Sequence, residues 1–338
     1  MTIGLGFIGA GAHARHHMKE FARIRDAELV AVYDLVVERA EEAARDFPAL
    51  RIAVSLDDLL LDPRVTAVVV ATPAETHEEI ALAAINAGLD ILLEKPMAHT
   101  VDSARAILNA VERNPQTILM VGHCERFNPS YLDIRKAVDD GHVGKPRFLI
   151  ASRISPRHLN NDAWKLGVLD TAVHDIDILL WLVGEPVVSV AAQGVSVAPE
   201  SSIFDHAAYQ IRFAGGALAD GAIGWLPFSK GYPMQGNAHP RLFVSGTKGV
   251  ATLDLWQRPA AVHTYSTGGY FWPDSVLTGY GDYSTEVTFQ DAAFIDAVLE
   301  RRPSPIAPRS SYDALRVAHA AHVSMTQRQG MPVQLEEE

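Results

Sequence analysis

The sequence predicts an α/β protein: an N-terminal Rossmann domain with a doubly wound parallel sheet, then a C-terminal α+β domain with a large, mostly antiparallel open sheet. In residues 1–121, short apolar runs alternate with Ala/Glu-rich amphipathic segments, and the runs lack polar alternation. Such runs are typical of parallel strands buried on both faces. After Val121, long strand-like runs joined by glycine turns indicate antiparallel pairing. We therefore expect a Rossmann domain over 1–122 and a substrate-binding and oligomerisation domain over 123–338.

The N-terminal half divides into alternating strands and helices. The expected strands are Ile3–Ile8, Leu29–Tyr33, Ile52–Val54, Ala67–Ala71, Asp90–Leu93 and Ile118–Val121. The expected helices are His13–Phe21, Val37–Arg45, Thr76–Ala87 and Val101–Arg113. Thr76 and Glu79, three positions apart, predict a capping box at the third helix, and Gly88 predicts its C-terminal cap.

The C-terminal half has fewer helices and longer strands. We expect helices at Pro129–Asp140, Thr171–Leu182, Thr285–Glu300 and Ser311–Gln329, the second of them ended by Gly184 and Pro186. The expected strands are Arg147–Ser152, Val187–Val197, His206–Phe213, Ala217–Trp225, Arg241–Ser245 and Val250–Leu255, with hairpin turns at 214–216 and 246–249. Residues 256–284 are rich in Gly, Tyr and Trp without a clear period, and we interpret them as a loop.

Composition excludes several classes of protein. The chain has 338 residues, and its net charge of -12 disfavours non-specific binding to nucleic acid or to an anionic membrane. Its single cysteine, Cys124, allows neither an intrachain disulfide nor a cysteine-rich zinc site. No run approaches the roughly 18 apolar residues of a membrane helix. We expect a cytoplasmic protein whose partner is a small molecule.

A dinucleotide fingerprint opens the chain. Gly9, Gly11 and Ala14 fit G-x-G-x-x-A after a full apolar strand, whereas the register Gly4, Gly6, Gly9 spends its glycines inside that strand. The helix N-terminus that follows, with Ala12 and His13, is positioned to meet the pyrophosphate charge. We therefore expect a nicotinamide dinucleotide at this turn.

The acidic residue that accompanies this fingerprint is also present. Asp34 ends the next strand, 23 residues after Gly11. A carboxylate there accepts hydrogen bonds from the ribose hydroxyls and repels a 2′-phosphate, so NAD is favoured over NADP. Two alternatives stay open: Arg39, one turn later, could reach a 2′-phosphate, and Asp34 could simply cap the loop.

Three residues form a candidate proton-transfer set. Asp170 and His174 are four residues apart on one helix face, so the carboxylate can orient the imidazole. Lys95 follows the apolar run at 91–93, where a strand would end. His174 is the candidate base, Asp170 its orienting group, and Lys95 a donor to the reacting oxygen. The roles of Lys95 and His174 are interchangeable at this stage.

Two other interpretations of this helix remain. His174 could be a packing histidine satisfied by Asp170 or Asp177. Asp170, His174 and Asp177 also share one helical face, as metal ligands would. Nicotinamide chemistry needs no metal and no further clustered ligand is evident, so we expect none.

Several further residues have weaker assignments. Thr72 and Pro73 follow the fourth strand and are expected to line the nicotinamide side of the cofactor. Glu94 could bond the nicotinamide ribose or pair with a nearby base. Arg126 and Asn128 could contact sugar hydroxyls or phosphate, although Asn128 could equally cap a helix.

At this point the sequence resembles the glucose–fructose oxidoreductase / inositol dehydrogenase (Gfo/Idh/MocA) family over nearly its whole length. The segments that carry the resemblance are Gly9–His17, Ala71–Pro73 with His77, Glu94–Pro96, Val121–Pro129, Gly144–Pro146, Leu169–Asp177 and Gly330–Val333. The resemblance implies NAD(P)-linked oxidation of a secondary hydroxyl on a sugar or cyclitol, with Lys95, Asp170 and His174 as the catalytic set. It implies a Lys-Pro bond that is often cis.

The resemblance also implies partners and neighbouring residues. The open sheet in this family often forms oligomer contacts, so we expect a homodimer or homotetramer. His77 and Trp164 map onto the family's cofactor site, Trp164 with Lys165 as its aromatic–basic pair, although the indole of Trp164 could equally pack on a core edge. The motifs at 122–129 and 169–177 look most like the branch acting on nucleotide-activated N-acetylhexosamines at the 3-hydroxyl. Rival functions on the same fold are a catalytically silent NAD- or sugar-sensing regulator and a lyase or epimerase that recycles NAD internally.

Overall fold

The computed structural model describes residues 2–156, 166–196, 204–226, 239–255, 258–264, 270–271 and 284–336. The chain forms two compact units. The first unit comprises Met1–Cys124 and Ser284–Leu315, and the second comprises Glu125–Tyr283 and Arg316–Glu338. The first division, at Cys124, lies close to the boundary expected at 122, but the sequence pattern does not indicate that the chain returns to the first unit.

The first unit contains a parallel sheet. Its described strands are β1 (Ile3–Ile8), β2 (Ala27–Tyr33), β3 (Arg51–Ile52), β4 (Ala67–Val70), β5 (Asp90–Leu93) and β6 (Leu119–Val121). They lie in the order β3-β2-β1-β4-β5-β6, and every pair is parallel. The strands β1, β4 and β5 are buried along their whole length, as the uninterrupted apolar runs predict. This is the doubly wound Rossmann arrangement, whose order reverses between β1 and β4.

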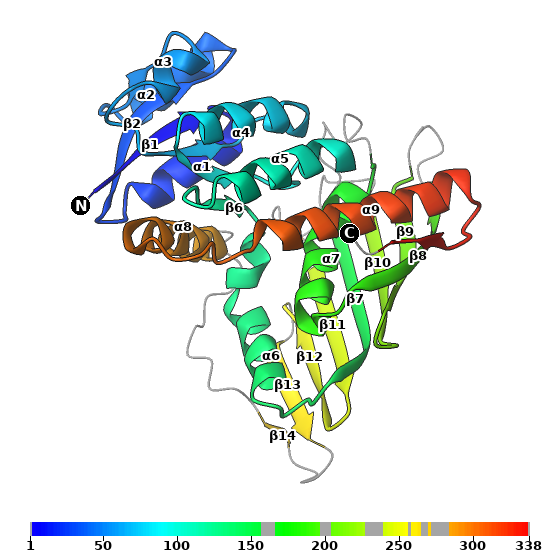
Figure 1. Ribbon diagram of the computed structural model, residues 1–338. Coiled ribbons are helices and arrows are strands. Elements are labelled where there is room, and N and C mark those ends of the chain that lie inside the picture. The colour runs from blue at the N-terminus through cyan, green and yellow to red at the C-terminus, as the bar shows by residue number, and fades with distance from the viewer. Residues whose placement is uncertain are drawn as a thin grey trace. The chain divides into compact units, whose positions relative to one another are not determined.

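Helices connect these strands (Figure 1). They are α1 (Ala12–Phe21), α2 (Val37–Asp46), α3 (Leu56–Leu60), the short 3₁₀ turn η1 (Ala74–Thr76), α4 (His77–Asn86) and α5 (Val101–Arg113). The predicted capping box is wrong: Thr76 makes no side-chain cap and its hydroxyl donates instead to Pro73 O at 2.8 Å. The physical reason is that η1 already turns the chain before α4 begins. Gly88 takes a φ of +75°, which confirms the expected glycine after this helix.

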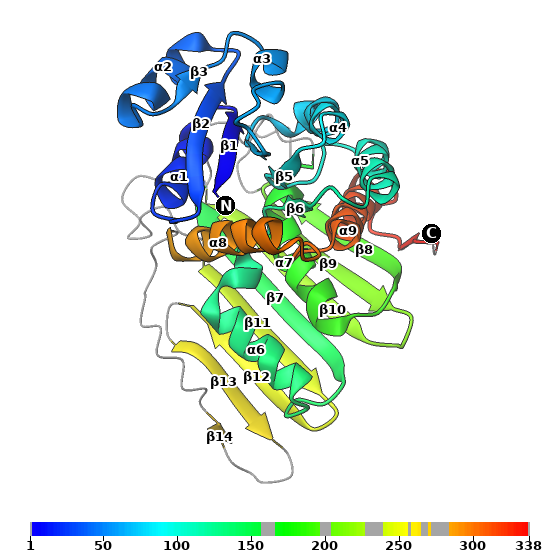
Figure 2. The ribbon, with the colours of Figure 1, turned by 60° about the vertical axis from the view of Figure 1, so that its left-hand side comes forward.

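The helix α8 (Ser284–Glu300) belongs to the first unit and packs along α1, as both ribbon views show (Figure 2). Thr288 donates to Oε2 of the buried Glu20 at 2.6 Å, and this hydrogen bond ties α8 to α1. The next helix, α9 (Pro308–Gln327), starts in the first unit and ends in the second.

The second unit is built on one large sheet. Its described strands are β7 (Pro146–Pro156), β8 (Val187–Val195), β9 (His206–Phe213), β10 (Leu218–Leu226), β11 (His239–Gly246), β12 (Gly249–Asp254), β13 (Arg258–Thr264), β14 (Tyr270–Phe271) and β15 (Val333–Gln334). Their order is β14-β13-β12-β11-β7-β10-β9-β8-β15, with β7 and β10 parallel and the other described pairs antiparallel. The expected mostly antiparallel sheet and both hairpins are confirmed.

Two helices cover one face of this sheet (Figure 1). The helix α6 (Pro129–Asp139) contacts β12 and β13, and α7 (Leu169–Val183) contacts β7 and β10. Gly184 ends α7 with a φ of +65°, as the sequence predicts. The interpretation of 256–284 as a loop is wrong for β13 and β14. The strand β13 pairs with β12 and β14 pairs with β13, so backbone pairing forms strands there without a hydrophobic period.

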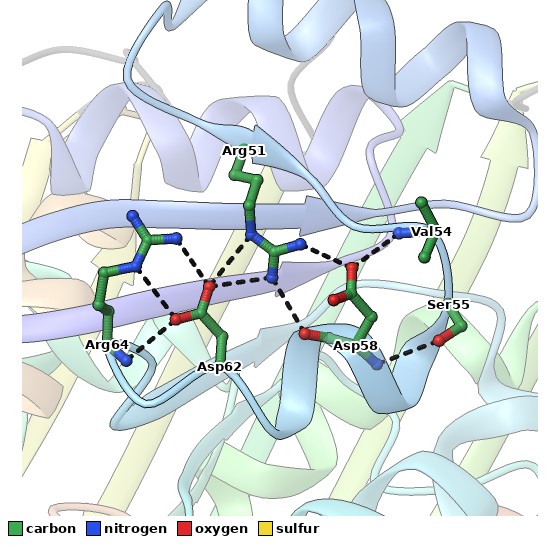
Figure 3. Close-up of polar contacts among 6 residues, drawn as sticks. All are labelled: Arg51, Val54, Ser55, Asp58, Asp62 and Arg64. Atoms are coloured by element: carbon green, nitrogen blue, oxygen red, sulfur yellow. Dashed lines mark hydrogen bonds and ion pairs between the residues drawn. The ribbon is translucent and has the colours of Figure 1, made fainter.

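An ion-pair network fixes the link between β3 and β4 at the edge of the first sheet (Figure 3). Arg51 donates to the Asp58 carboxylate at 2.6 Å and to that of Asp62 at 3.1 Å. Arg64 donates to the same oxygen of Asp62, Oδ2, at 2.8 Å and to its Oδ1 at 3.1 Å. Such exposed pairs contribute little each, but together they hold a two-residue strand in register. The network contains none of the residues that the sequence assigns to a cofactor or substrate.

Candidate active site

The glycine turn between β1 and α1 has the geometry that a dinucleotide requires. Gly9 has a φ of +95°, and a Cβ there would lie 2.6 Å from Ala71 O, so only glycine fits. A Cβ at Gly11 would meet nothing within 4 Å, so the space beside this backbone is open. Gly11 is also the N-cap of α1, which has no side-chain cap and no acidic residue in its first turn. The N–H groups of this turn therefore fit a pyrophosphate.

The two residues that follow this glycine turn are exposed. Ala12 and His13 are both exposed in the first turn of α1. Nε2 of His13 lies 3.9 Å from Oε2 of Glu94, the residue that follows β5. The glycine turn and the end of β5 thus meet at the carboxyl edge of the sheet, where doubly wound sheets bind ligands.

Asp34 follows β2 and holds the glycine turn. Its Oδ2 accepts the N–H of Ala10 at 2.7 Å, and its Oδ1 accepts the N–H of Val36 at 2.8 Å. The loop-capping role that the sequence left open is therefore present. A carboxylate has about four acceptor positions, so it can still receive hydroxyl donors beside these two bonds. The residues present fit NAD.

The turns after β4 and β5 are joined by His77. Its Nε2 lies 3.0 Å from Thr72 O, and its Nδ1 lies 3.0 Å from Pro96 O. The ring is only 1% exposed, and burial lowers the pKa of His77 although the two carbonyls act against that shift. The structure thus places His77 between the loop of Thr72 and Pro73 and the loop that carries Lys95. The Lys95–Pro96 peptide bond is cis, as the resemblance implied.

Glu94 lies against a histidine that the sequence analysis does not single out. Oε1 of Glu94 is 3.0 Å from Nε2 of His17 on α1, and Oε2 accepts the N–H of Lys95 at 3.1 Å. Burial acts to raise the pKa of Glu94, but the hydrogen bond from His17 and the charges of His13, His17 and Lys95 lower it to about 2. Glu94 is therefore a carboxylate at neutral pH.

The second unit carries the other candidate catalytic residues on α7. Asp170 lies in its first turn and accepts the N–H of Leu166 at 3.1 Å, which ties the preceding turn to the helix. His174 lies one turn later and is 6% exposed. Trp164 lies outside the described residues.

Two neighbours of His174 on α7 bind arginines. Both oxygens of Asp175 accept hydrogen bonds from Arg153 of β7, at 2.9–3.1 Å. Arg153 also pairs with Glu125 at 2.7 Å. The side chains of this cluster are all at most 8% exposed, and burial raises the pKa of Asp175 against the attraction of Arg153. The sequence offers no local signal for this cluster, because its members lie on separate elements.

Arg126, which we expected to contact substrate, forms a buried ion pair. It lies in the 3₁₀ turn η2 (Cys124–Phe127) and donates from Nε and Nη2 to the two oxygens of Asp177, at 2.7 and 2.6 Å. Its guanidinium also lies 5.5 Å from the ring centroid of Trp181. Asn128 caps α6, since its Oδ1 accepts the N–H of Ser130 at 2.9 Å. Both residues therefore have structural partners in this unit.

Comparison with known proteins extends these observations. The model of the oxidoreductase family with an NAD-binding Rossmann fold, Gfo/Idh/MocA, matches residues 3–123, and that of the Gfo/Idh/MocA C-terminal domain matches residues 131–252. The chain belongs to the Gfo/Idh/MocA family. Its first unit is an NAD-binding Rossmann domain, and the protein is an oxidoreductase of this family.

Curated relatives and solved structures agree with this assignment. The inositol 2-dehydrogenase of Rhizobium meliloti is 30% identical over 98% of this chain and 100% of its own. Inositol 2-dehydrogenase 2 of Saccharopolyspora erythraea is 36% identical, but the alignment spans only 57% of each chain. An oxidoreductase domain protein from Kribbella flavida has the same fold, with a TM-score of 0.86 over the whole of both chains at 24% identity.

Two kinds of feature are absent from the described ranges. Within them, no group of three or more His, Cys, Asp or Glu side chains is arranged to hold a metal ion. None of the helices in the described ranges is long and apolar enough to cross a membrane.

Proposed function

We propose that this protein is an NAD-dependent dehydrogenase that interconverts a secondary ring hydroxyl and a ketone on a cyclitol or related sugar. The observation that carries the proposal is that Lys95 follows β5, beside the cofactor turn, while Asp170 and His174 occupy the first two turns of α7. Full-length similarity to an inositol 2-dehydrogenase supports a cyclitol over a nucleotide sugar.

The proposed roles follow from the chemistry of each group. NAD, when bound, supplies the acceptor for the hydride that leaves the carbinol carbon. His174 removes the hydroxyl proton as that hydride leaves, since a neutral imidazole is a base near neutral pH. Asp170 orients the imidazole. Lys95 donates a hydrogen bond to the same oxygen and stabilises the charge that develops on it. In the reverse direction His174 returns the proton to the ketone oxygen.

The remaining predicted site residues divide by their contacts. We propose that Gly9, Gly11, Ala12, His13, Thr72 and Pro73 line the cofactor and that Asp34 and Glu94 accept ribose hydroxyls. His77 acts by holding the two loops that its ring joins. Arg126 and Asn128 act by holding α7 and α6, because their described bonds are made within the second unit.

The test follows formation of NADH or NADPH against inositols, free aldoses, glycosides and nucleotide sugars. Turnover of inositols with NAD supports the proposal, and turnover restricted to nucleotide sugars replaces its substrate class. Net conversion with the cofactor bound and unreduced indicates a lyase or epimerase. Binding of NAD without conversion of any compound indicates the regulator. The matched control for His174→Ala is His319→Ala, at an exposed position of α9.

We also propose that the protein assembles as a homodimer or homotetramer through the open sheet. Phe148 and Ile150 of β7 are 36% and 41% exposed, and they alternate with buried residues that face α7. Exposed apolar side chains in one row are typical of interfaces. Light scattering should give a mass above that of one chain, and Ile150→Lys should lower it. A monomeric wild-type protein would contradict this proposal.

A further inference from the structure

Three side chains from distant parts of the chain form a buried cluster in the first unit. Nδ1 of His17, on α1, lies 2.9 Å from both oxygens of Asp291 on α8. Its Nε2 lies 3.0 Å from Oε1 of Glu94, at the end of β5. The His17 side chain is 1% exposed, that of Asp291 0% and that of Glu94 11%.

The geometry determines the protonation of His17. Each ring nitrogen faces a carboxylate oxygen at hydrogen-bond distance, and a carboxylate can only accept. With Asp291 and Glu94 both ionised, both nitrogens carry hydrogen, which makes the ring an imidazolium. Burial acts to lower the pKa of His17, but attraction to Asp291 and hydrogen bonds to Asp291 and Glu94 raise it to about 10.

Glu94 links His17 to the backbone of the next residue, Lys95. While Oε1 faces His17, Oε2 accepts the backbone N–H of Lys95 at 3.1 Å. Its carboxylate also fits closely against Gly122, the residue after β6: a Cβ there would lie 2.7 Å from Oε1. The carboxylate is therefore held from three sides, and the turn that carries Lys95 is held through it.

Other charged groups surround the cluster. His13 lies 3.9 Å from Oε2 of Glu94, and Lys95 adds a positive charge on the same side. His16, the neighbour of His17 on α1, has a lowered pKa because burial and the charge of His17 act against its protonation, while the charge of Glu20 acts in the opposite direction. These groups and the two carboxylates are the charged neighbours that a titration of His17 has to take into account.

We propose that His17 is a positioning residue: held as an imidazolium by Asp291 of α8, it fixes the Glu94 carboxylate and, through it, the turn that presents Lys95. This inference rests on the proposed function, in which Lys95 donates to the reacting oxygen. It also gives α8 a role in catalysis without contact between that helix and the substrate.

The test compares two substitutions on α8. Asp291→Asn keeps an acceptor for Nδ1–H and removes one charge, whereas Thr288→Val removes a different bond between α8 and α1, the one to Glu20. If the cluster only docks α8, both variants lower thermal stability and neither changes kcat. If His17 positions Lys95, Asp291→Asn alone lowers kcat by about tenfold or more with KM little changed, which is a loss of transition-state stabilisation.

The pH profile separates the two explanations further. With one anionic partner left, His17 in Asp291→Asn loses its second proton at a lower pH than in the wild type. A neutral ring has one N–H and cannot donate to both neighbours, so kcat of this variant should fall on the alkaline side where wild type and Thr288→Val do not. Equal profiles for Asp291→Asn and Thr288→Val would overturn the proposal.

Two measurements do not depend on activity. In ¹⁵N NMR of the wild-type chain both ring nitrogens of His17 should carry hydrogen at pH 8; a neutral His17 overturns the proposal even if no variant folds. After ¹³C-dimethylation, the Lys95 signal, assigned by its loss in Lys95→Arg, should move in Asp291→Asn and not in Thr288→Val. If the Lys95 signal responds in this way while the wild type converts no compound, the proposed function fails and the positioning relationship stands.

Discussion

Arg153 of β7 binds both carboxylate oxygens of Asp175, the residue that follows His174 on α7. Consecutive residues of a helix point about 100° apart, so an anchor on Asp175 sets the direction of His174 without contacting it. Asp177 adds a second anchor through Arg126. The rotation of α7 about its own axis is thus fixed by two buried ion pairs.

The Arg153 cluster predicts unequal losses of stability. Arg153→Met leaves Glu125 and Asp175 buried together without a cation, and we expect the free energy of unfolding to fall by about 3–5 kcal/mol. Asp175→Asn leaves a neutral Arg153–Glu125 pair and should cost less than half as much. Urea unfolding measures both. Equal losses would mean that the charge balance of the cluster does not matter.

The His17 cluster predicts how stability depends on pH. The pKa of His17 is raised from 6.5 to about 10. Its contribution is complete below 6.5 and is lost as pH rises towards 10. The pKa of Glu94 is lowered from 4.5 to about 2, so its contribution is complete above 4.5 and is lost as pH falls towards 2. Burial raises the pKa of Asp291, which partly offsets the loss on the acid side.

Thermal unfolding checks the alkaline limb of this dependence. We expect the wild-type Tm to fall by more than about 3 °C between neutral pH and pH 9.5, as a loss of roughly 1 kcal/mol implies for a unit of this size. In His17→Gln the amide does not titrate and the slope should be smaller. A slope that persists unchanged in His17→Gln would assign it to other groups.

Asp34 predicts the choice between NAD and NADP. Asp34→Ser removes the negative charge that repels a 2′-phosphate and also the acceptor of Ala10 N–H, so NAD should bind about tenfold more weakly while NADP gains relative to it. Asp34→Asn removes the same charge and retains one acceptor, which separates the two effects. Titration of each cofactor gives the ratio of dissociation constants. If that ratio stays at its wild-type value in both variants, the ribose contact is refuted.

The identity of the base predicts different pH profiles for two variants. His174→Ala should lower kcat by about 10²–10⁴-fold while NAD affinity stays near normal, and it should remove the acid limb of the kcat profile. Lys95→Met should lower kcat and keep that limb. If Lys95→Met removes the acid limb and His174→Ala keeps it, the roles of the two residues are exchanged. Lys19→Met, at an exposed position of α1, is the control.

Local patterns in the sequence predicted the parts of the molecule that depend on neighbouring residues. The spacing from Gly11 to Asp34 lies within one strand–helix–strand unit, and Gly88 and Gly184 end helices by backbone conformation alone. The capping box predicted at Thr76 is wrong because a 3₁₀ turn precedes the helix. The strand Arg258–Thr264 was missed because strand pairing, not a hydrophobic period, defines it.

The candidate site was predicted only where it follows strand ends and helix faces. Lys95, Asp170 and His174 come from such positions. His17 was not singled out, since its partner Asp291 lies 274 residues away and nothing between them marks the contact. Arg126 was given a substrate role because an arginine near a site resembles a ligand-binding group until its partner, Asp177, is known.

The first unit is discontinuous, so the ribosome makes its two segments at separate times. A nascent fragment that ends at Cys124 has every strand of the parallel sheet but lacks α8, so His17 meets Glu94 without Asp291, and the face of α1 that α8 covers stays open to water. The first unit is therefore complete only after the ribosome has made β7 to β14 of the second unit, then α8 and the start of α9 up to Leu315. At that point of synthesis the second unit is nearly complete, because it lacks only the end of α9 and β15.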